Sequence, residues 1–186
     1  SCYMGAMGEA LLETMQTAKA LEAARASVAE RTEAYGIAVK SCEYGQRLGD
    51  IENELTRRRN IALAGMRALR LAATVVAEAT SHKWTDHLIS FGGTVANTGA
   101  KVTVQVMSDA MDMAQEQHEL LMTQYQNYFS DMICFNDAKL HLVGLKTAQI
   151  NMEAAVLGTE RSVQRARTMA SRLDALREEG RVAIAR

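Results

Sequence analysis

The chain has 186 residues, a formal net charge of -1 and no proline. A nearly neutral chain gives no global support to nonspecific binding of duplex nucleic acid, and we expect no specific nucleic-acid partner. Because proline is the residue that most reliably interrupts a helix, its absence favours long helices. Aromatic residues make up only 5% of the chain, which suits helices that meet along narrow seams. We therefore predict an all-α protein, either an elongated antiparallel helical bundle or a coiled-coil hairpin of long helices.

Residues 1–8 have neither the charged start nor the apolar run of a signal peptide. We interpret them as a cloning remnant, and residues 9–186 as a single helical domain. The three cysteines, Cys2, Cys42 and Cys134, show no CxxC or CxxH spacing, so we expect no disulfide framework. A reducing compartment is the default for such a chain. We expect a cytoplasmic protein, with a peripheral position at a membrane as the alternative.

After residue 8, apolar residues recur at steps of three and four, the spacing of a helix with a coiled-coil seam. Arg25 and Thr32 fall on this stripe and weaken it. The segment Gly45–Asp50 offers a glycine to end one helix and an aspartate to cap the next. A second stripe continues across this segment, so a continuous helix with a kink is an equal alternative. Its members are Tyr44, Leu48, Ile51, Leu55, Ala62, Met66, Leu69, Ala73 and Val76.

Two adjacent glycines make the next candidate break, because glycine loses the most conformational freedom in a helix. We place the main turn there, at Phe91–Gly93, so that two arms of nearly equal length could pair as a hairpin. Alternating valines over residues 102–106 resemble a strand, but no second strand-like run exists, and we interpret them as the start of a helix. Helical spacing then continues, with Gly144 or Gly158 as candidate breaks before a final arginine-rich helix.

Arginines are the candidate contact residues for a partner or a membrane. Five of them occur between residues 55 and 77 without an acidic residue, and more follow in the last region. They can pair with acidic helices, or they can lie on an anionic lipid surface, where each contributes up to about 1 kcal/mol. The candidates are Arg57, Arg58, Arg59, Arg67, Arg70, Arg161, Arg165 and Arg172.

One dense aromatic patch follows the third helical region and contains Tyr125, Tyr128, Phe129 and Phe135. Their spacing puts most of them on one face of a helix. We interpret the patch as part of the core or as a dimer interface, because aromatic residues are the usual anchors of both. A ligand groove is the alternative that we consider weaker.

Sites for metals, cofactors or catalysis have little support. Cys134, Asp137 and His141 share a helix face, as do Glu78, His82 and Asp86, but neither group has the repeated Glu-x-x-His spacing of a di-iron bundle. Glycine-rich phosphate-binding motifs and the Gly-x-Ser-x-Gly nucleophile motif are absent from the sequence. We expect no catalytic residue, no metal, no cofactor and no small-molecule substrate.

The sequence therefore predicts a non-enzymatic helical module for protein–protein interaction or scaffolding. Helices with narrow apolar seams bury too little alone, so we expect the chain to form a homodimer or to bind another helical protein. The alternative is a helical dimer that binds or bends membranes through its arginine-rich stripes. A third hypothesis, insertion into a membrane through residues 88–106, is weaker because Asn97 and Lys101 interrupt that segment.

Overall fold

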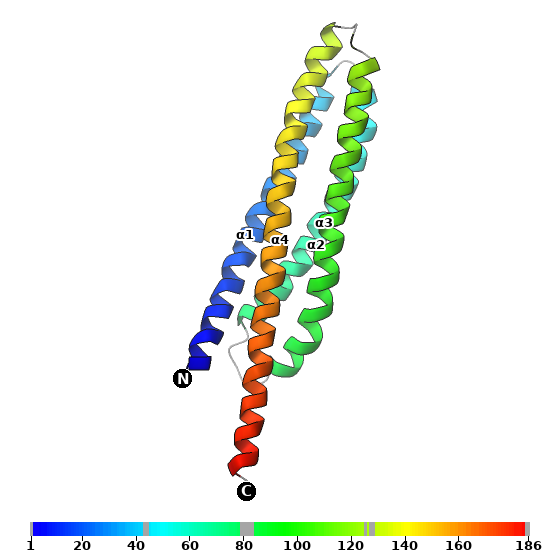
Figure 1. The fold of residues 1–186 in the computed structure, drawn as a ribbon. Helices are drawn as coiled ribbons and strands as arrows, with labels where there is room; N and C mark the ends of the chain where they lie inside the picture. Colours follow the sequence, from blue (N-terminus) through cyan, green and yellow to red (C-terminus); the bar gives the residue numbers. More distant parts are fainter. Residues whose placement is uncertain (1, 43–44, 79–83, 125, 127–128, 185–186) are drawn as a thin grey trace. The chain divides into compact units, whose positions relative to one another are not determined.

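The computed structural model describes residues 2–42, 45–78, 84–124, 126 and 129–184, with side chains described over 5–42, 48–76, 100–124, 126 and 132–184. Every regular element in these ranges is a helix: α1 (Cys2–Lys40), α2 (Gly45–Glu78), α3 (Trp84–Gln124) and α4 (Phe129–Ile184) (Figure 1). The all-α prediction is confirmed. Within the described residues, no helix is both long enough and apolar enough to cross a membrane.

The predicted main turn at Phe91–Gly93 is wrong, because α3 runs through these residues from Trp84 to Gln124. Glycine lowers helix stability by about 1 kcal/mol relative to alanine, but unlike proline it keeps its backbone donor. Once a helix is formed, each added residue contributes a backbone hydrogen bond. The hydrogen bonds of a long helix can therefore outweigh the destabilisation by two glycines. The helix boundaries instead fall between Glu78 and Trp84, which removes the hairpin of two equal arms.

The other glycine breaks have mixed outcomes. The break near Gly45 is confirmed, since α1 ends at Lys40 and α2 begins at Gly45, but α2 then continues through Gly49. The candidate breaks at Gly144 and Gly158 are wrong, because both residues lie inside α4. Positive φ angles, which would favour glycine at a helix end, occur at none of the described glycines.

The chain divides into two compact units, each with segments of all four helices. Unit 1 comprises Ser1–Glu22, Met66–Ala100 and Ala155–Arg186, and unit 2 comprises Ala23–Gly65 and Lys101–Ala154. In each unit α1 and α4 are antiparallel neighbours. Residue numbers on α4 fall as those on α1 rise, both in the unit 1 contacts between the two helices and in those of unit 2.

The core of unit 2 is filled by large apolar side chains from all four helices. The predicted stripe on α2 is confirmed here and in unit 1, because each of its described members is buried. Thr32 on α1 is also buried, and its hydroxyl donates to the Val28 carbonyl at 2.7 Å, so it occupies the seam without an unsatisfied polar group. The largest fully buried side chains of unit 2 are Tyr35, Leu48, Ile51, Leu55, Met107, Met111, Phe135, Leu145 and Met152.

Unit 1 combines apolar packing with a short polar layer between α1 and α4. The Thr17 and Ser162 hydroxyls lie 2.7 Å apart, and the Thr159 hydroxyl lies 3.1 Å from the Thr17 carbonyl oxygen. Leu21, Met66 and Leu69 are fully buried in the same unit. Residues 2–8, which we had set aside as a cloning remnant, form the first turns of α1, and Met7 is buried.

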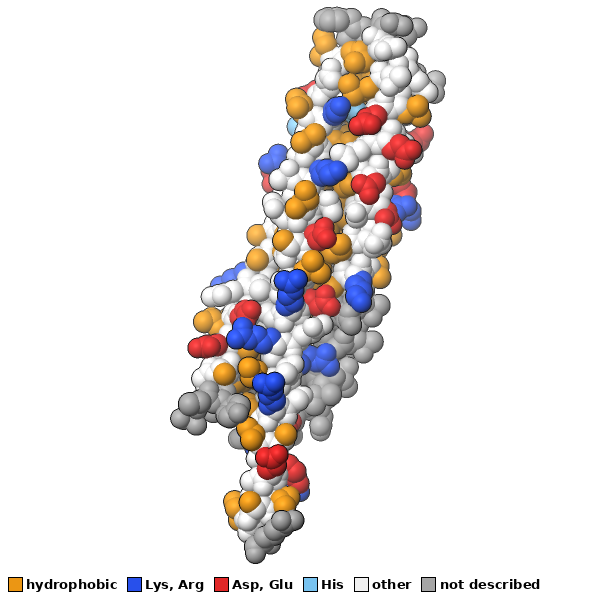
Figure 2. Space-filling view, in the orientation of Figure 1, with side chains coloured by type: hydrophobic (Ala, Val, Ile, Leu, Met, Phe, Trp, Pro, Cys, Tyr) orange, Lys and Arg blue, Asp and Glu red, His pale blue; other side chains and the backbone are white. Residues whose placement is uncertain are grey.

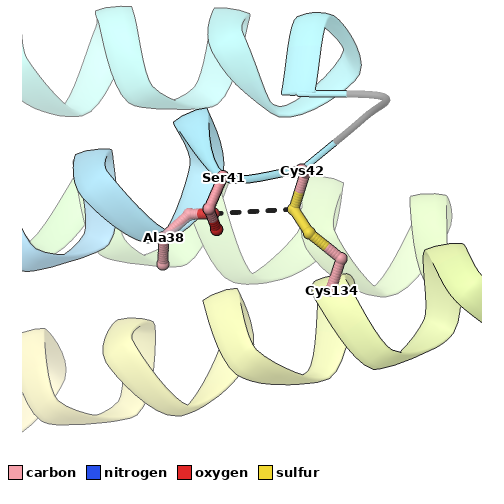
Figure 3. Close-up of a disulfide and its surroundings, with 4 residues drawn as sticks. All are labelled: Ala38, Ser41, Cys42 and Cys134. Atoms are coloured by element: carbon pink, nitrogen blue, oxygen red, sulfur yellow. Dashed lines mark hydrogen bonds between the residues drawn. A yellow bond between two sulfur atoms is a disulfide. The ribbon is translucent and has the colours of Figure 1, made fainter.

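A disulfide bond joins Cys42, just after α1, to Cys134 on α4 in unit 2 (Figure 3). The two Cα atoms are 5.7 Å apart, within the usual range for such a bond. Cys42 is placed by the end of α1, where the Ser41 amide donates to the Ile37 carbonyl and the Ser41 hydroxyl to the Ala38 carbonyl. The cysteine spacing predicted no disulfide framework, and for Cys42 and Cys134 that prediction is wrong. Sequence spacing could not reveal this bond, because its partners are 92 residues apart and meet only through helix packing.

Candidate interaction surface

The arginines of unit 2 mostly contact their own helix. Arg57 and Arg58 both donate to the Glu54 carboxylate, with closest N–O distances of 2.6 Å, and Arg59 donates to the Asn60 side chain at 3.0 Å. The hydrogen bonds from Arg57 and then from Arg58 lower the pKa of Glu54 to about 2. These three side chains therefore form a helix-surface cluster that is partly neutralised by Glu54.

Two arginines of unit 1 reach from one helix to another. Arg70 on α2 pairs with Glu22 on α1 at 2.8 Å, and Arg165 on α4 pairs with Glu13 on α1 at the same distance. Arg67, Arg161 and Arg172 are exposed and make no ion pair with the residues that the structure describes. Half of the eight candidate arginines thus hold carboxylates, and the structure does not assemble all eight into one site.

Of the predicted aromatic patch, only the Phe135 side chain can be placed. Tyr125 and Tyr128 lie outside the described residues, as does the side chain of Phe129, the first residue of α4. Phe135 is fully buried in unit 2, where its ring centroid lies 6.5 Å from that of His118 in an edge-on arrangement. Phe135 therefore packs in the core of its own chain, which is one of the two roles that we predicted for the patch.

His118 and Tyr35 are the buried ionisable side chains of this core. Their ring centroids are 6.5 Å apart, and neither His118 ring nitrogen nor the Tyr35 hydroxyl has a hydrogen-bond partner among the described residues. Burial, followed by the nearby charge of Lys139, lowers the pKa of His118. Burial, with a smaller effect of Glu52, raises the pKa of Tyr35. Both groups are thus held neutral in the folded state.

The space beside His118 is too small for a substrate. A cavity of about 30 Å³ lies between α3 and α4, whereas sites for small molecules usually measure about 300–1,000 Å³. Its lining residues are Gln115, His118, Glu119, Lys139, Leu142 and Val143. Because His118 is only 1% exposed, it cannot reach a molecule bound at the surface. His118 and Tyr35 therefore pack in the core of unit 2, and His118 is a poor candidate for acid–base chemistry.

The structure also bears on the two acidic and cysteine-containing groups singled out in the sequence. Cys134 is bonded to Cys42 and has no free thiolate to offer beside Asp137 and His141. The group of Glu78, His82 and Asp86 falls where the side chains are not described. Across the part of the chain that the structure describes, no group of three His, Cys, Asp or Glu side chains is arranged to hold a metal ion.

A stripe on α4 that we did not identify from the sequence carries four of the eight large hydrophobic side chains that are exposed in the described part of unit 2. It consists of residues at alternating steps of three and four, all of them exposed, and we call it the outer face of α4: Ile133, Asn136, Leu140, Val143, Thr147, Ile150 and Ala154. Leu140 is 70% exposed and Ile133 is 60% exposed. Figure 2 shows hydrophobic side chains on the surface along the course of α4, with charged side chains beside them.

The outer face repeats the seam pattern of a coiled coil, but on the side of α4 that is turned away from the core. The inner side of the helix is already buried, through Phe135, Ala138, Leu142, Leu145 and Met152. Each seam in a coiled coil buries its apolar positions against a facing helix. In unit 2, α4 therefore carries two seams and uses one of them within its own chain.

Comparison with protein-family models, with curated proteins and with solved structures found no match to this chain.

Proposed function

We propose that this chain is a non-enzymatic helical module that binds a helical protein partner, in the first place itself, through the outer face of α4. The observation that carries the proposal is a second, exposed seam with coiled-coil spacing on a helix whose inner seam is already packed. A row of exposed apolar side chains marks an interaction site more often than scattered single ones do.

Self-association of the full chain tests this proposal. Over roughly 1–100 µM, we expect sedimentation equilibrium to detect a dimer. Leu140→Glu should weaken this dimer about tenfold or more, because it places a charge in the middle of the buried seam. Leu140 is mostly exposed, so the substitution leaves the core of unit 2 untouched.

A matched control separates a lost interface from a general effect of an added charge. Leu120 on α3 is 58% exposed and does not belong to the outer face of α4. Leu120→Glu should keep both the helical circular dichroism and the dimer of the unmodified chain. If Leu140→Glu and Leu120→Glu have the same effect on association, the outer face is not the binding surface.

A membrane-binding dimer remains the alternative function. The exposed Arg67, Arg161 and Arg172 of unit 1 are the observation in its favour, since they hold no carboxylate among the described residues and arginines attract anionic lipid. The ion pairs of Arg70 and Arg165 count against it, because those side chains already hold carboxylates of α1. The test is whether the chain sediments with liposomes that contain anionic lipid. Such sedimentation, abolished by the double variant Arg161→Ala, Arg172→Ala, would support the membrane alternative. The interaction proposal predicts that sedimentation does not depend on lipid charge.

The disulfide affects the expected location. Bonds such as Cys42–Cys134 persist mainly in oxidising compartments, and they are rare in the cytoplasm. The bond therefore favours an oxidising compartment over the cytoplasmic location that the cysteine spacing suggested. The interaction proposal does not depend on this choice, because the outer face of α4 contains no cysteine.

A further inference from the structure

The charges beside the outer face of α4 change sign along the helix. The charged residues on one edge of the face are Lys139, Lys146 and Glu153, which directly precede Leu140, Thr147 and Ala154. The other edge consists of Asp137, Gly144 and Asn151, which directly follow Asn136, Val143 and Ile150. We call the first of these the charged edge and the second the opposite edge. The charged edge is thus basic in its first half and acidic at its end.

We propose that the partner at this face is a second copy of the chain, bound so that the two α4 helices run antiparallel across a twofold axis. This inference rests on the proposed function and names its partner. In an antiparallel pair, the charged edge of one copy lies along the charged edge of the other. When Lys139 of each copy faces Glu153 of the second copy, this attractive contact forms twice, once on each side of the axis, and it outnumbers the single Lys146–Lys146 contact at the axis.

A parallel pair does not use these charges. In that arrangement the charged edge of each copy faces the opposite edge of the other, so Lys139 would lie near Gly144 and Lys146 near Asn151. Neither contact pairs opposite charges. Edge charges set the orientation of coiled-coil partners, and of the two orientations only the antiparallel one gives Lys139 an acidic neighbour.

The contacts within the chain are compatible with this pairing. Lys146 donates to the Gln115 side chain on α3 at 2.7 Å, which fixes its ammonium group at the edge of α4. An ammonium group has three donors, so Lys146 can keep this bond and still face a carboxylate of the second copy. Of the three residues on the opposite edge only Asp137 is charged, and the Arg31 side chain of α1 lies 3.7 Å from the Cβ position of Gly144.

Charge reversal of the full chain tests the orientation. Glu153→Lys makes the charged edge entirely basic, and we expect it to weaken the dimer about fivefold or more at low ionic strength. The triple variant Lys139→Glu, Lys146→Glu, Glu153→Lys inverts every charge of the edge and should restore the association of the unmodified chain. Mixing Glu153→Lys with Lys139→Glu, Lys146→Glu should also form a mixed dimer more readily than either variant forms its own.

The outcomes separate this inference from the proposed function. If Leu140→Glu abolishes the dimer but Glu153→Lys and the triple variant leave it unchanged, the outer face binds a second copy without antiparallel charge pairing, and the inference fails alone. If the triple variant is as weak as Glu153→Lys, the edges do not face each other and the inference also fails. A chain that stays monomeric over the whole concentration range overturns both the inference and the self-association on which it rests.

Discussion

Reduction of the Cys42–Cys134 disulfide is the perturbation whose effect on stability can be worked out most directly. The bond links positions 92 residues apart, and in the folded state it holds the end of α1 against the start of α4. In the chain-entropy model, closing a loop of this length in the unfolded chain removes entropy worth about 4–5 kcal/mol at 25 °C. We therefore expect reduction, or Cys134→Ser, to lower the free energy of unfolding by about that amount.

Urea denaturation of oxidised and reduced protein measures this difference. The slope of the unfolding free energy with urea should also rise on reduction, because the unfolded chain without the bond exposes more surface. Cys2→Ser is the control, since the bond joins the other two cysteines and should remain intact. Free Cys42 and Cys134 thiols in unreduced protein, or a loss below about 1 kcal/mol on reduction, would refute the reasoning.

Two further predictions concern the pH dependence of stability and the glycines inside helices. The pKa of His118 is lower in the folded than in the unfolded state, so as the pH falls the unfolded state binds the proton first. The contribution of His118 to the unfolding free energy should therefore be constant above about pH 6.5 and decrease below it. His118→Leu should flatten this decrease, measured as urea midpoints at pH 7.5 and 5.5, and an unchanged slope would exclude His118 as its source. Gly49→Ala should raise the unfolding free energy by about 0.5–1 kcal/mol, because nothing lies within 4 Å of an added Cβ on this helical residue. Gly36→Ala should gain less or lose stability in the same urea assay, since its Cβ would lie 2.7 Å from the Glu52 carboxylate, and equal gains at both sites would contradict the packing argument.

The candidate surface could be predicted from the sequence only in part. The sequence identifies α4 as helical, and the steps of three and four from Ile133 to Ala154 are visible in it. That spacing could have found the outer face. It could not show which of the two apolar stripes on α4 is buried, because both have helical periodicity and only packing against α1 and α3 distinguishes them. The arginines show the same limit, since Arg70 and Arg165 find their carboxylates on a helix far away in the sequence.

Local composition was enough to determine that the chain is helical and which face of α2 is buried, because the backbone donors that proline would remove are all present and the apolar spacing follows the helix turn. The helix boundaries, the Cys42–Cys134 bond and the second, exposed seam on α4 were decided by tertiary structure. The physical reason is the same for all three. Neighbours that are distant in the sequence determine whether the chain turns at a glycine pair, whether two cysteines meet and whether a leucine stays exposed. The packing energy of these neighbours exceeds the local helix preference of about 1 kcal/mol per residue.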